Sequence, residues 1–257
     1  MKDTYILAIE SSCDETAASI VKNAKEIVSN VVATQIDVHK DFGGVIPEVA
    51  SRIHVENISM VIEETLHKAN MKVEDVDAIA VTQGPGLVGS LHVGVQAAKT
   101  LAWAYNKPLV PVHHIAGHIY ANQLITELKF PLLALVVSGG HTELVYMKDE
   151  WSFEILGTTQ DDAIGEAGDK VGRVLGLPYP GGVYVDKIAK DGKPIYSLAK
   201  PKTENELDFS FSGLKSSVLQ FIDRCKRKNE TFRPEDLAAS YQETAFETLL
   251  SRAKNRN

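Results

Sequence analysis

Two histidines four residues apart are the side chains best placed to do chemistry in this sequence. His114 and His118 follow an apolar run at 109–112, which we expect to form a buried strand. If a helix begins near His113, the two imidazoles share one helical face and can bind one metal ion. The sites of open α/β sheets lie at such strand ends. The alternative is a set of surface or hydrogen-bonded histidines without a ligand, and His113 is the one we expect to be structural.

A turn with two glycines is the second candidate site. Residues 131–137 form an apolar run that we expect to be the most strongly buried strand of the chain. After it, Gly139 and Gly140 have no Cβ atom to keep a phosphate or ribose away from the backbone, so we favour a ligand-binding turn over a plain hairpin. Asp169 and Asp186, on two expected helices, could hold ribose hydroxyls beside this turn. Two solvated carboxylates are the equal alternative.

The first part of the chain supplies a run of short strands and one long helix. Strands are expected at 5–9, 17–21 and 27–33, and a helix is expected to begin at Pro47. An apolar stripe at helical spacing marks the core face of this helix, and His54 and His67 are expected to be solvated off that stripe. The polar turn at 10–16 could offer hydroxyl and N–H groups to a phosphate. We favour an ordinary hairpin with solvated carboxylates there.

A glycine-rich turn at 83–90 connects an expected strand at 76–82 to an expected helix at 91–105. The glycines at 84, 86, 89 and 94 do not have the spacing of a dinucleotide-binding fingerprint. No acidic residue follows about 20 positions later, where that fingerprint needs one. The glycines allow either close packing of the helix on the strand or close approach of the backbone to a ligand, and both interpretations stay open.

The second part of the chain is expected to be mostly helical. A strand is expected at 153–157, and helices are expected up to Leu175, from near Val183, up to Ile222 and from Pro234. A basic cluster follows the third of these helices and consists of Arg224, Lys226, Arg227 and Lys228. Such a run is usually a solvated face, and an RNA contact is the alternative.

The strand–turn–strand pattern of residues 5–21 returns at 131–147, which indicates two related lobes with a cleft between them. We expect an N-terminal lobe at 1–130, which includes the paired histidines, and a second lobe at 131–257. The chain is therefore predicted to be an α/β protein.

Composition excludes several classes of protein. The chain has 257 residues, 44% of them apolar, and a net charge of −7, which disfavours bulk electrostatic binding to nucleic acid. The two cysteines, Cys13 and Cys225, form no disulfide framework. No signal peptide and no membrane-spanning run is expected, so we predict a cytoplasmic protein. The ending after an amphipathic helix is abrupt, and we expect the second lobe to be incomplete.

Eight motifs together resemble the family of tRNA threonylcarbamoyladenosine transferases of the bacterial TsaD type, formerly called glycoproteases. They cover the chain in the family's order and are highly specific as a set. They are IESSCDET at 9–16, PEVASR at 47–52, GPGL at 84–87, HHIAGH at 113–118, VSGGHT at 137–142, GEA with DK at 165–170, YPGG at 179–182 and FSFSGLK at 209–215.

This resemblance implies an actin-like ATPase fold of two lobes, related to sugar kinases. It implies transfer of a threonylcarbamoyl group from threonylcarbamoyl-adenylate to the N6 amine of the adenosine beside the anticodon. The family's metal ligands, for iron or zinc, correspond to His114 and His118. Its nucleotide contacts, for the adenylate or ATP/ADP, correspond to Val136, Val137, Ser138, Gly139, Gly140, Asp169, Gly182 and Asp186.

The resemblance also implies partners. The substrate is tRNA, and the acidic charge of the chain indicates that tRNA binding depends on partner proteins. These are expected to be the family's inactive paralogue and a small ATPase, with a homodimer as the state of the isolated chain. No membrane partner is expected.

Departures from the family pattern concern the metal site and one helix. The family usually has a bulky residue at position 168 and often Ala at 172, where this chain has Gly168 and Gly172. The archaeal branch has a tyrosine ligand at the position of Val136. An aspartate that completes the family's metal site has no counterpart here, so we expect two protein ligands, weak or no metal occupancy, and water or buffer completing any coordination.

Three other functions compete with acyl transfer. A metalloprotease of the zincin type needs a glutamate directly after its first histidine, and Ile115 stands there. A non-catalytic nucleotide-binding scaffold is the second alternative, but the inactive paralogue would lack the paired histidines. A small-molecule kinase of the same fold is disfavoured, because no aspartate for sugar phosphorylation stands out.

Overall fold

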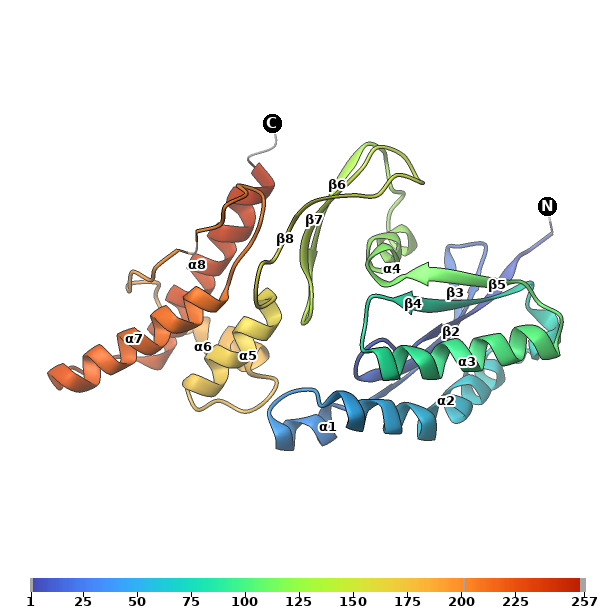
Figure 1. The fold of residues 1–257 in the computed structure, drawn as a ribbon, viewed down its shortest axis with the longest axis horizontal. Helices are drawn as coiled ribbons and strands as arrows, with labels where there is room; N and C mark the ends of the chain where they lie inside the picture. The colour runs from blue at the N-terminus through green and yellow to red at the C-terminus, as the bar shows by residue number, and fades with distance from the viewer. Residues whose placement is uncertain (1, 201, 255–257) are drawn as a thin grey trace. The chain divides into compact units, whose positions relative to one another are not determined.

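The computed structural model describes residues 2–200 and 202–254. The chain divides into two compact units, Met1–Leu128 and Lys129–Asn257 (Figure 1). Each unit has its own sheet and its own hydrophobic core, so we describe each by itself.

Unit 1 is built on a five-stranded sheet with the strand order β3-β2-β1-β4-β5. The first three strands form an antiparallel meander, and β4 and β5 extend the sheet in parallel. The strands are β1 (Tyr5–Glu10), β2 (Glu15–Lys22), β3 (Glu26–Thr34), β4 (Ala78–Gly84) and β5 (Leu109–His113). The expected strands of this unit are therefore confirmed within a few residues.

Two long helices, α2 (Pro47–Ala69) and α3 (Val88–Ala104), lie side by side against this sheet (Figure 1). Proline stands at the start of α2, as expected, and Asn70 ends the helix in the left-handed conformation. The unit's shorter helices are α1 (Ile36–His39), α4 (His114–Tyr120) and the 3-10 turns Lys40–Phe42, Val73–Asp75 and Ala121–Leu124.

One prediction about α2 is wrong. His54 is not solvated: it is fully buried, one turn after Ala50 and one turn before Ile58. The polar ring is accommodated because both of its nitrogens have partners. Nδ1 lies 2.7 Å from Thr16 Oγ1, and Nε2 lies 2.9 Å from the Cys13 carbonyl oxygen. His67, in contrast, is exposed as expected.

The predicted burial of the strand before the histidines is also wrong. β5 is an edge strand of the five-stranded sheet, and Leu109 and Val110 are 38% and 41% exposed. An apolar run predicts a strand but not its place in the sheet, which depends on pairing with residues far away in the sequence.

Unit 2 contains a three-stranded antiparallel sheet with the order β6-β7-β8. Its strands are β6 (Leu132–Val137), β7 (Thr142–Met147) and β8 (Glu154–Thr158). β6 was expected to be the most buried strand, and this is wrong, because β6 lies at an edge and β7 is central and more buried. The β1–β2–β3 meander of unit 1 thus has a counterpart, as the repeated sequence pattern predicts.

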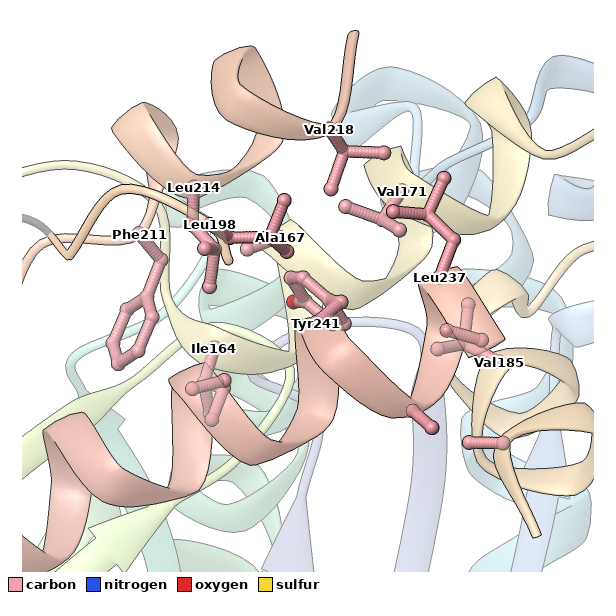
Figure 2. Close-up of a cluster of buried hydrophobic side chains, with 14 of the residues drawn as sticks. Ile164, Ala167, Val171, Val185, Leu198, Phe211, Leu214, Val218, Leu237 and Tyr241 are labelled. Carbon is pink, nitrogen blue, oxygen red and sulfur yellow. The ribbon is translucent and has the colours of Figure 1, made fainter. Parts of the chain in front are cut away.

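The described residues of unit 2 also form the helices α5 (Ile164–Val174), α6 (Gly181–Ala189), α7 (Ser212–Lys228) and α8 (Pro234–Lys254). Their apolar faces meet in one core, where Leu237 and Tyr241 of α8 lie among side chains of α5, α6 and α7 (Figure 2). α7 is longer than expected: basic residues in its last turn continue the helix to Lys228, and Asn229 follows in the left-handed conformation. No helix in the described ranges is long and apolar enough to cross a membrane.

Candidate active site

The two histidines of unit 1 converge as their spacing predicts. α4 begins at His114, so His114 and His118 lie one turn apart on the same helical face. Their Nε2 atoms are 3.1 Å apart, and the rings meet edge to face with centroids separated by 4.5 Å. His113, the last residue of β5, is exposed and precedes the helix.

Glu10 supports the first of these imidazoles. One carboxylate oxygen of Glu10 lies 3.4 Å from His114 Nδ1, and Ser12 Oγ lies 3.3 Å from the same nitrogen. A proton on Nδ1 satisfies both oxygens and leaves a lone pair on Nε2, which faces His118. The expectation of a solvated carboxylate at the end of β1 is therefore wrong for Glu10.

The charge state of this cluster follows from its hydrogen bonds. Burial alone would raise the pKa of Glu10, but hydrogen bonds from His114, Ser12 and Thr82 lower it to about 2. Partial burial lowers the pKa of His118, the neighbouring His114 lowers it further, and Glu10 opposes both effects. Glu10 is therefore ionised at neutral pH, and the His118 ring is biased toward the neutral form that binds metals.

Among the described residues, His114 and His118 are arranged so that they could bind one metal ion. Two imidazole nitrogens 3.1 Å apart can point at one ion, and a carboxylate behind His114 is the partner that metal-binding histidines commonly have. Within the described part of the chain, no group of three or more His, Cys, Asp or Glu side chains is arranged around one metal position.

The glycine-rich turn before α3 packs directly on the β1–β2 turn. A Cβ atom added to Gly86 would lie 2.6 Å from the Ser12 carbonyl oxygen, and Leu87 N donates to that oxygen at 2.7 Å. Ser11 Oγ donates to Ser90 O at 2.8 Å and accepts from Gly94 N at 3.1 Å. These contacts show that the glycines serve close packing, while the ligand-approach interpretation stays a prediction.

In unit 2, the β6–β7 turn rests on the N-terminus of α5. Gly165 N donates to Ser138 O at 3.3 Å, Glu166 N donates to Gly139 O at 3.2 Å, and Ile164 N donates to Thr142 Oγ1 at 3.0 Å. The hairpin therefore caps α5, and these three amide groups are already used. A ligand at the turn would be held by the backbone of the turn itself.

The turn is open on its other side. Cβ atoms added to Gly139 and Gly140 would have no neighbour within 4 Å. Val136, on the strand before the turn, is buried, so only its backbone could face a ligand, whereas Val137 is 47% exposed. The structure thus brings Ser138, Gly139 and Gly140 together in one exposed bend.

The structure treats the two aspartates differently. Asp169 lies near the middle of α5 and accepts a hydrogen bond from Gly182 N at 2.8 Å, which ties α5 to the start of α6. Burial raises the pKa of Asp169, although the bond from Gly182 opposes this. Asp186, one turn further along α6, is half-exposed and pairs with Lys190 at 2.9 Å and with Gln242 at 3.1 Å. Asp169 and Gly182 therefore meet, and Asp186 faces other partners.

A further anchor is absent from the sequence interpretation. Asp161 accepts hydrogen bonds from Ser210 Oγ at 2.6 Å, Ser212 Oγ at 2.7 Å and Phe211 N at 2.7 Å, so it holds the start of α7. Its neighbours are about 50 residues away, and only the serine-rich motif before α7 hinted at an acceptor.

Comparisons with known proteins identify the family of this chain. The sequence profile described as TsaD, tRNA N6-adenosine threonylcarbamoyltransferase, matches residues 26–256. The proteins named tRNA N6-adenosine threonylcarbamoyltransferase from Anoxybacillus flavithermus and Staphylococcus carnosus are 62% and 60% identical to this chain. The alignments cover 97% and 98% of this chain and 73% and 74% of those proteins.

Solved structures identify the fold. The chain is similar to component A of the (R)-2-hydroxyglutaryl-CoA dehydratase of Acidaminococcus fermentans, with a TM-score of 0.54, 14% identity, and coverage of 100% of this chain and 80% of that one. It is also similar to the activator of the 2-hydroxyisocaproyl-CoA dehydratase of Clostridium difficile, with a TM-score of 0.52, 15% identity, and coverage of 100% and 76%. The actin-like ATPase fold is therefore confirmed, and the chain belongs to the family of tRNA N6-adenosine threonylcarbamoyltransferases.

Proposed function

We propose that this protein transfers the threonylcarbamoyl group of threonylcarbamoyl-adenylate to the N6 amine of the adenosine beside the anticodon, in tRNAs that read codons beginning with A. Membership of the family supports the reaction. The convergence of His114 Nε2 and His118 Nε2, with Glu10 behind His114, is the observation on this chain that carries the proposal.

His114 and His118 are the residues that would hold iron or zinc. When bound, the ion supplies Lewis-acid polarisation of the carbamoyl or phosphate oxygen of the donor. Glu10 keeps the Nδ1 proton of His114 in place, so that Nε2 stays an acceptor. Ser12 and Thr82, both hydrogen-bonded partners in this cluster, hold Glu10 and His114 in position.

The bend at 138–140 would hold the adenylate, or ATP or ADP, by its backbone. The absence of Cβ atoms at Gly139 and Gly140 leaves room for a phosphate or ribose there. Asp169, Gly182 and Asp186, with the strand end at Val136 and Val137, would complete the nucleotide site. Asp169 acts here by holding Gly182, and the half-exposed Asp186 offers its carboxylate to hydroxyl groups.

The transfer forms one C–N bond and breaks one C–O bond and one N–H bond, whose proton passes to the solvent. The N6 nitrogen attacks the carbamoyl carbon, a C–N bond forms, and the C–O bond to the phosphate breaks. AMP leaves with the electron pair of that bond, and the amine loses one proton. We assign no residue of this chain as the base.

The direct test measures incorporation of labelled threonine into an unmodified tRNA transcript. The protein is supplied with threonylcarbamoyl-adenylate that carries the labelled threonine, with ATP, and with the expected partners, an inactive paralogue and a small ATPase. His114→Ala and His118→Ala are expected to abolish incorporation, and the exposed His67→Ala serves as the matched control. Incorporation that survives both substitutions would refute the role of the histidine pair.

Two outcomes would point to another function. Binding of ADP without any incorporation would favour a non-catalytic scaffold of the same complex. Cleavage of a protein substrate that a chelator stops would favour a metalloprotease.

A further inference from the structure

We propose that a basic hollow beside the C-terminal half of α7 binds the phosphate backbone of RNA. The hollow has a volume of about 520 Å³. Its lining residues include none of those assigned to the candidate active site and come from α7 and from the irregular segment before it. They are Ser197, Leu198, Ser217, Gln220, Phe221, Arg224, Arg227 and Lys228.

The lining of the hollow is selective for an anion. Among the described residues, it contains three cationic side chains, two hydroxyl groups and one amide, and no Asp or Glu. This composition is unusual for a chain with 34 acidic and 27 basic residues. Cations gathered at one place in an acidic protein attract a polyanion there, while the remaining surface repels it.

The register of α7 builds one wall of the hollow. Ser217, Gln220, Arg224 and Arg227 follow one another at steps of three and four residues, so they lie on one helical face. The segment around Ser197 forms the opposite wall, and Ala199 N donates to Ser217 Oγ at 3.0 Å, which ties this segment to the helix. The Ser217 hydroxyl can still donate its own hydrogen to a phosphate oxygen.

The arginines are positioned without being neutralised. The Arg224 guanidinium lies over the Phe221 ring, 5.2 Å from its centroid, and Arg227 Nε donates to the Asp223 carbonyl oxygen at 3.3 Å. No carboxylate oxygen of the described residues lies within 4.0 Å of either guanidinium. Lys228 has only a long pair with Glu230, at 3.9 Å, and both side chains are exposed.

Other lysines of unit 2 are paired more closely. Lys190 and Lys200 have carboxylate oxygens at 2.9 Å and 2.6 Å. The helix dipole favours cations in the last turn of α7, which accounts for Lys226, Arg227 and Lys228. It does not account for Arg224, which lies before that turn, or for the lack of Asp and Glu among the described residues that line the hollow.

RNA phosphate is the occupant that these groups fit best. Guanidinium groups bind phosphate oxygens in a bidentate way, and two of them one turn apart can contact neighbouring phosphates. Phe221 is buried, so the hollow offers no aromatic face on which a base could stack. The contact is therefore with the backbone and independent of sequence. This inference rests on the proposed function for its choice of tRNA as the RNA.

The experiment measures binding of a labelled tRNA transcript to the protein over a range of salt concentrations. Arg224→Gln and Arg227→Gln are each expected to weaken binding roughly three- to tenfold at low salt. Each is also expected to reduce the slope of log K against log salt by about 0.7–0.9, the value for one lost phosphate contact. The matched control is Lys226→Gln, on the same helical turn but outside the hollow, which is expected to change neither quantity.

Other readouts separate the possible outcomes. Arg224→Lys keeps the charge and is expected to restore most of the salt slope, and unchanged thermal unfolding shows that the variants are folded. Equal effects of Arg224→Gln and Lys226→Gln, or no effect of either arginine substitution, would overturn the proposal. Binding of polyglutamate, a model of an acidic protein, is measured on the same variants. If the arginine substitutions abolish polyglutamate binding and leave tRNA binding unchanged, the proposal is overturned in favour of an acidic protein partner.

The measurements distinguish a refutation of the RNA-binding hollow from a refutation of the proposed transferase function. Threonine incorporation by a protein whose arginine variants bind tRNA normally would refute the hollow and leave the transferase activity intact. If the protein has no transferase activity and the arginine substitutions leave the slope of log K against log salt unchanged, both the hollow and the proposed function are refuted. A protein without transferase activity whose tRNA binding still depends on Arg224 would support the hollow alone.

Discussion

The contact between α5 and the glycine turn can be tested with one methyl group. A Cβ atom added to Gly165 would lie 2.7 Å from Gly139 Cα and 2.8 Å from Ser138 O. Carbon atoms in ordinary contact are about 3.5–4.0 Å apart, so the turn must move by roughly 0.7–1 Å. The two hydrogen bonds from Gly165 N and Glu166 N to the turn are then strained or lost.

The chain contains a matched control for this substitution. Gly165 is the second residue of α5, and Gly213 is the second residue of α7. A Cβ atom added to Gly213 would meet nothing within 4 Å. Both Gly→Ala changes gain helix propensity, up to about 1 kcal/mol. Only Gly165→Ala has the steric cost, about 1–3 kcal/mol for forcing a group into a packed site.

The assay compares thermal unfolding and ADP binding of the two variants. Since about 1 kcal/mol corresponds to roughly 2–4 °C in a chain of this size, Gly165→Ala is expected to unfold about 2–12 °C below Gly213→Ala. ADP binding is expected to weaken in Gly165→Ala alone, because the bend at 138–140 is displaced. Equal unfolding temperatures together with equal ADP affinities would refute the structural role of this contact.

Two further predictions concern unit 1. Glu10→Gln is expected to destabilise the protein at neutral pH. The pKa of Glu10 falls from 4.5 to about 2 on folding. The Glu10 carboxylate therefore stabilises the folded protein fully above about pH 4.5, and this stabilisation is lost as the pH approaches 2. Unfolding of both proteins from pH 2.5 to 7 checks this, and a constant difference across that range would contradict it. His54→Ala is expected to cost about 2–4 kcal/mol, since it leaves a cavity and two unpaired oxygens, while the exposed His67→Ala is expected to stay within about 0.5 kcal/mol in denaturant unfolding. Equal stabilities of these two variants would show that the buried ring contributes nothing.

Local patterns predicted the elements of this fold well. Apolar runs bounded by proline and glycine located the strands, and Pro47 and Pro234 located the starts of two long helices. The position of each strand in its sheet was not predictable in the same way. β5 and β6 are apolar yet lie at sheet edges, because pairing order depends on contacts between distant segments.

The candidate site was predicted in part for the same reason. The four-residue spacing of His114 and His118 sets their distance within one helix, so the sequence carries this information. The contact of Glu10 with His114 spans 104 positions, and no local pattern encodes it. His54 shows the opposite limit: a polar residue is buried where two distant oxygens satisfy its ring, which polarity alone does not indicate.

The two three-stranded meanders differ at their first turns. The β1–β2 turn carries carboxylate and hydroxyl side chains, among them Glu10 and Ser12, whereas the β6–β7 turn presents bare backbone at Gly139 and Gly140. The same strand arrangement therefore carries reactive side chains at one turn and exposed backbone at the other. The two turns should therefore tolerate different substitutions. Isosteric replacements that remove a carboxylate or hydroxyl group test the role of the β1–β2 turn, and any added side chain tests the role of the β6–β7 turn.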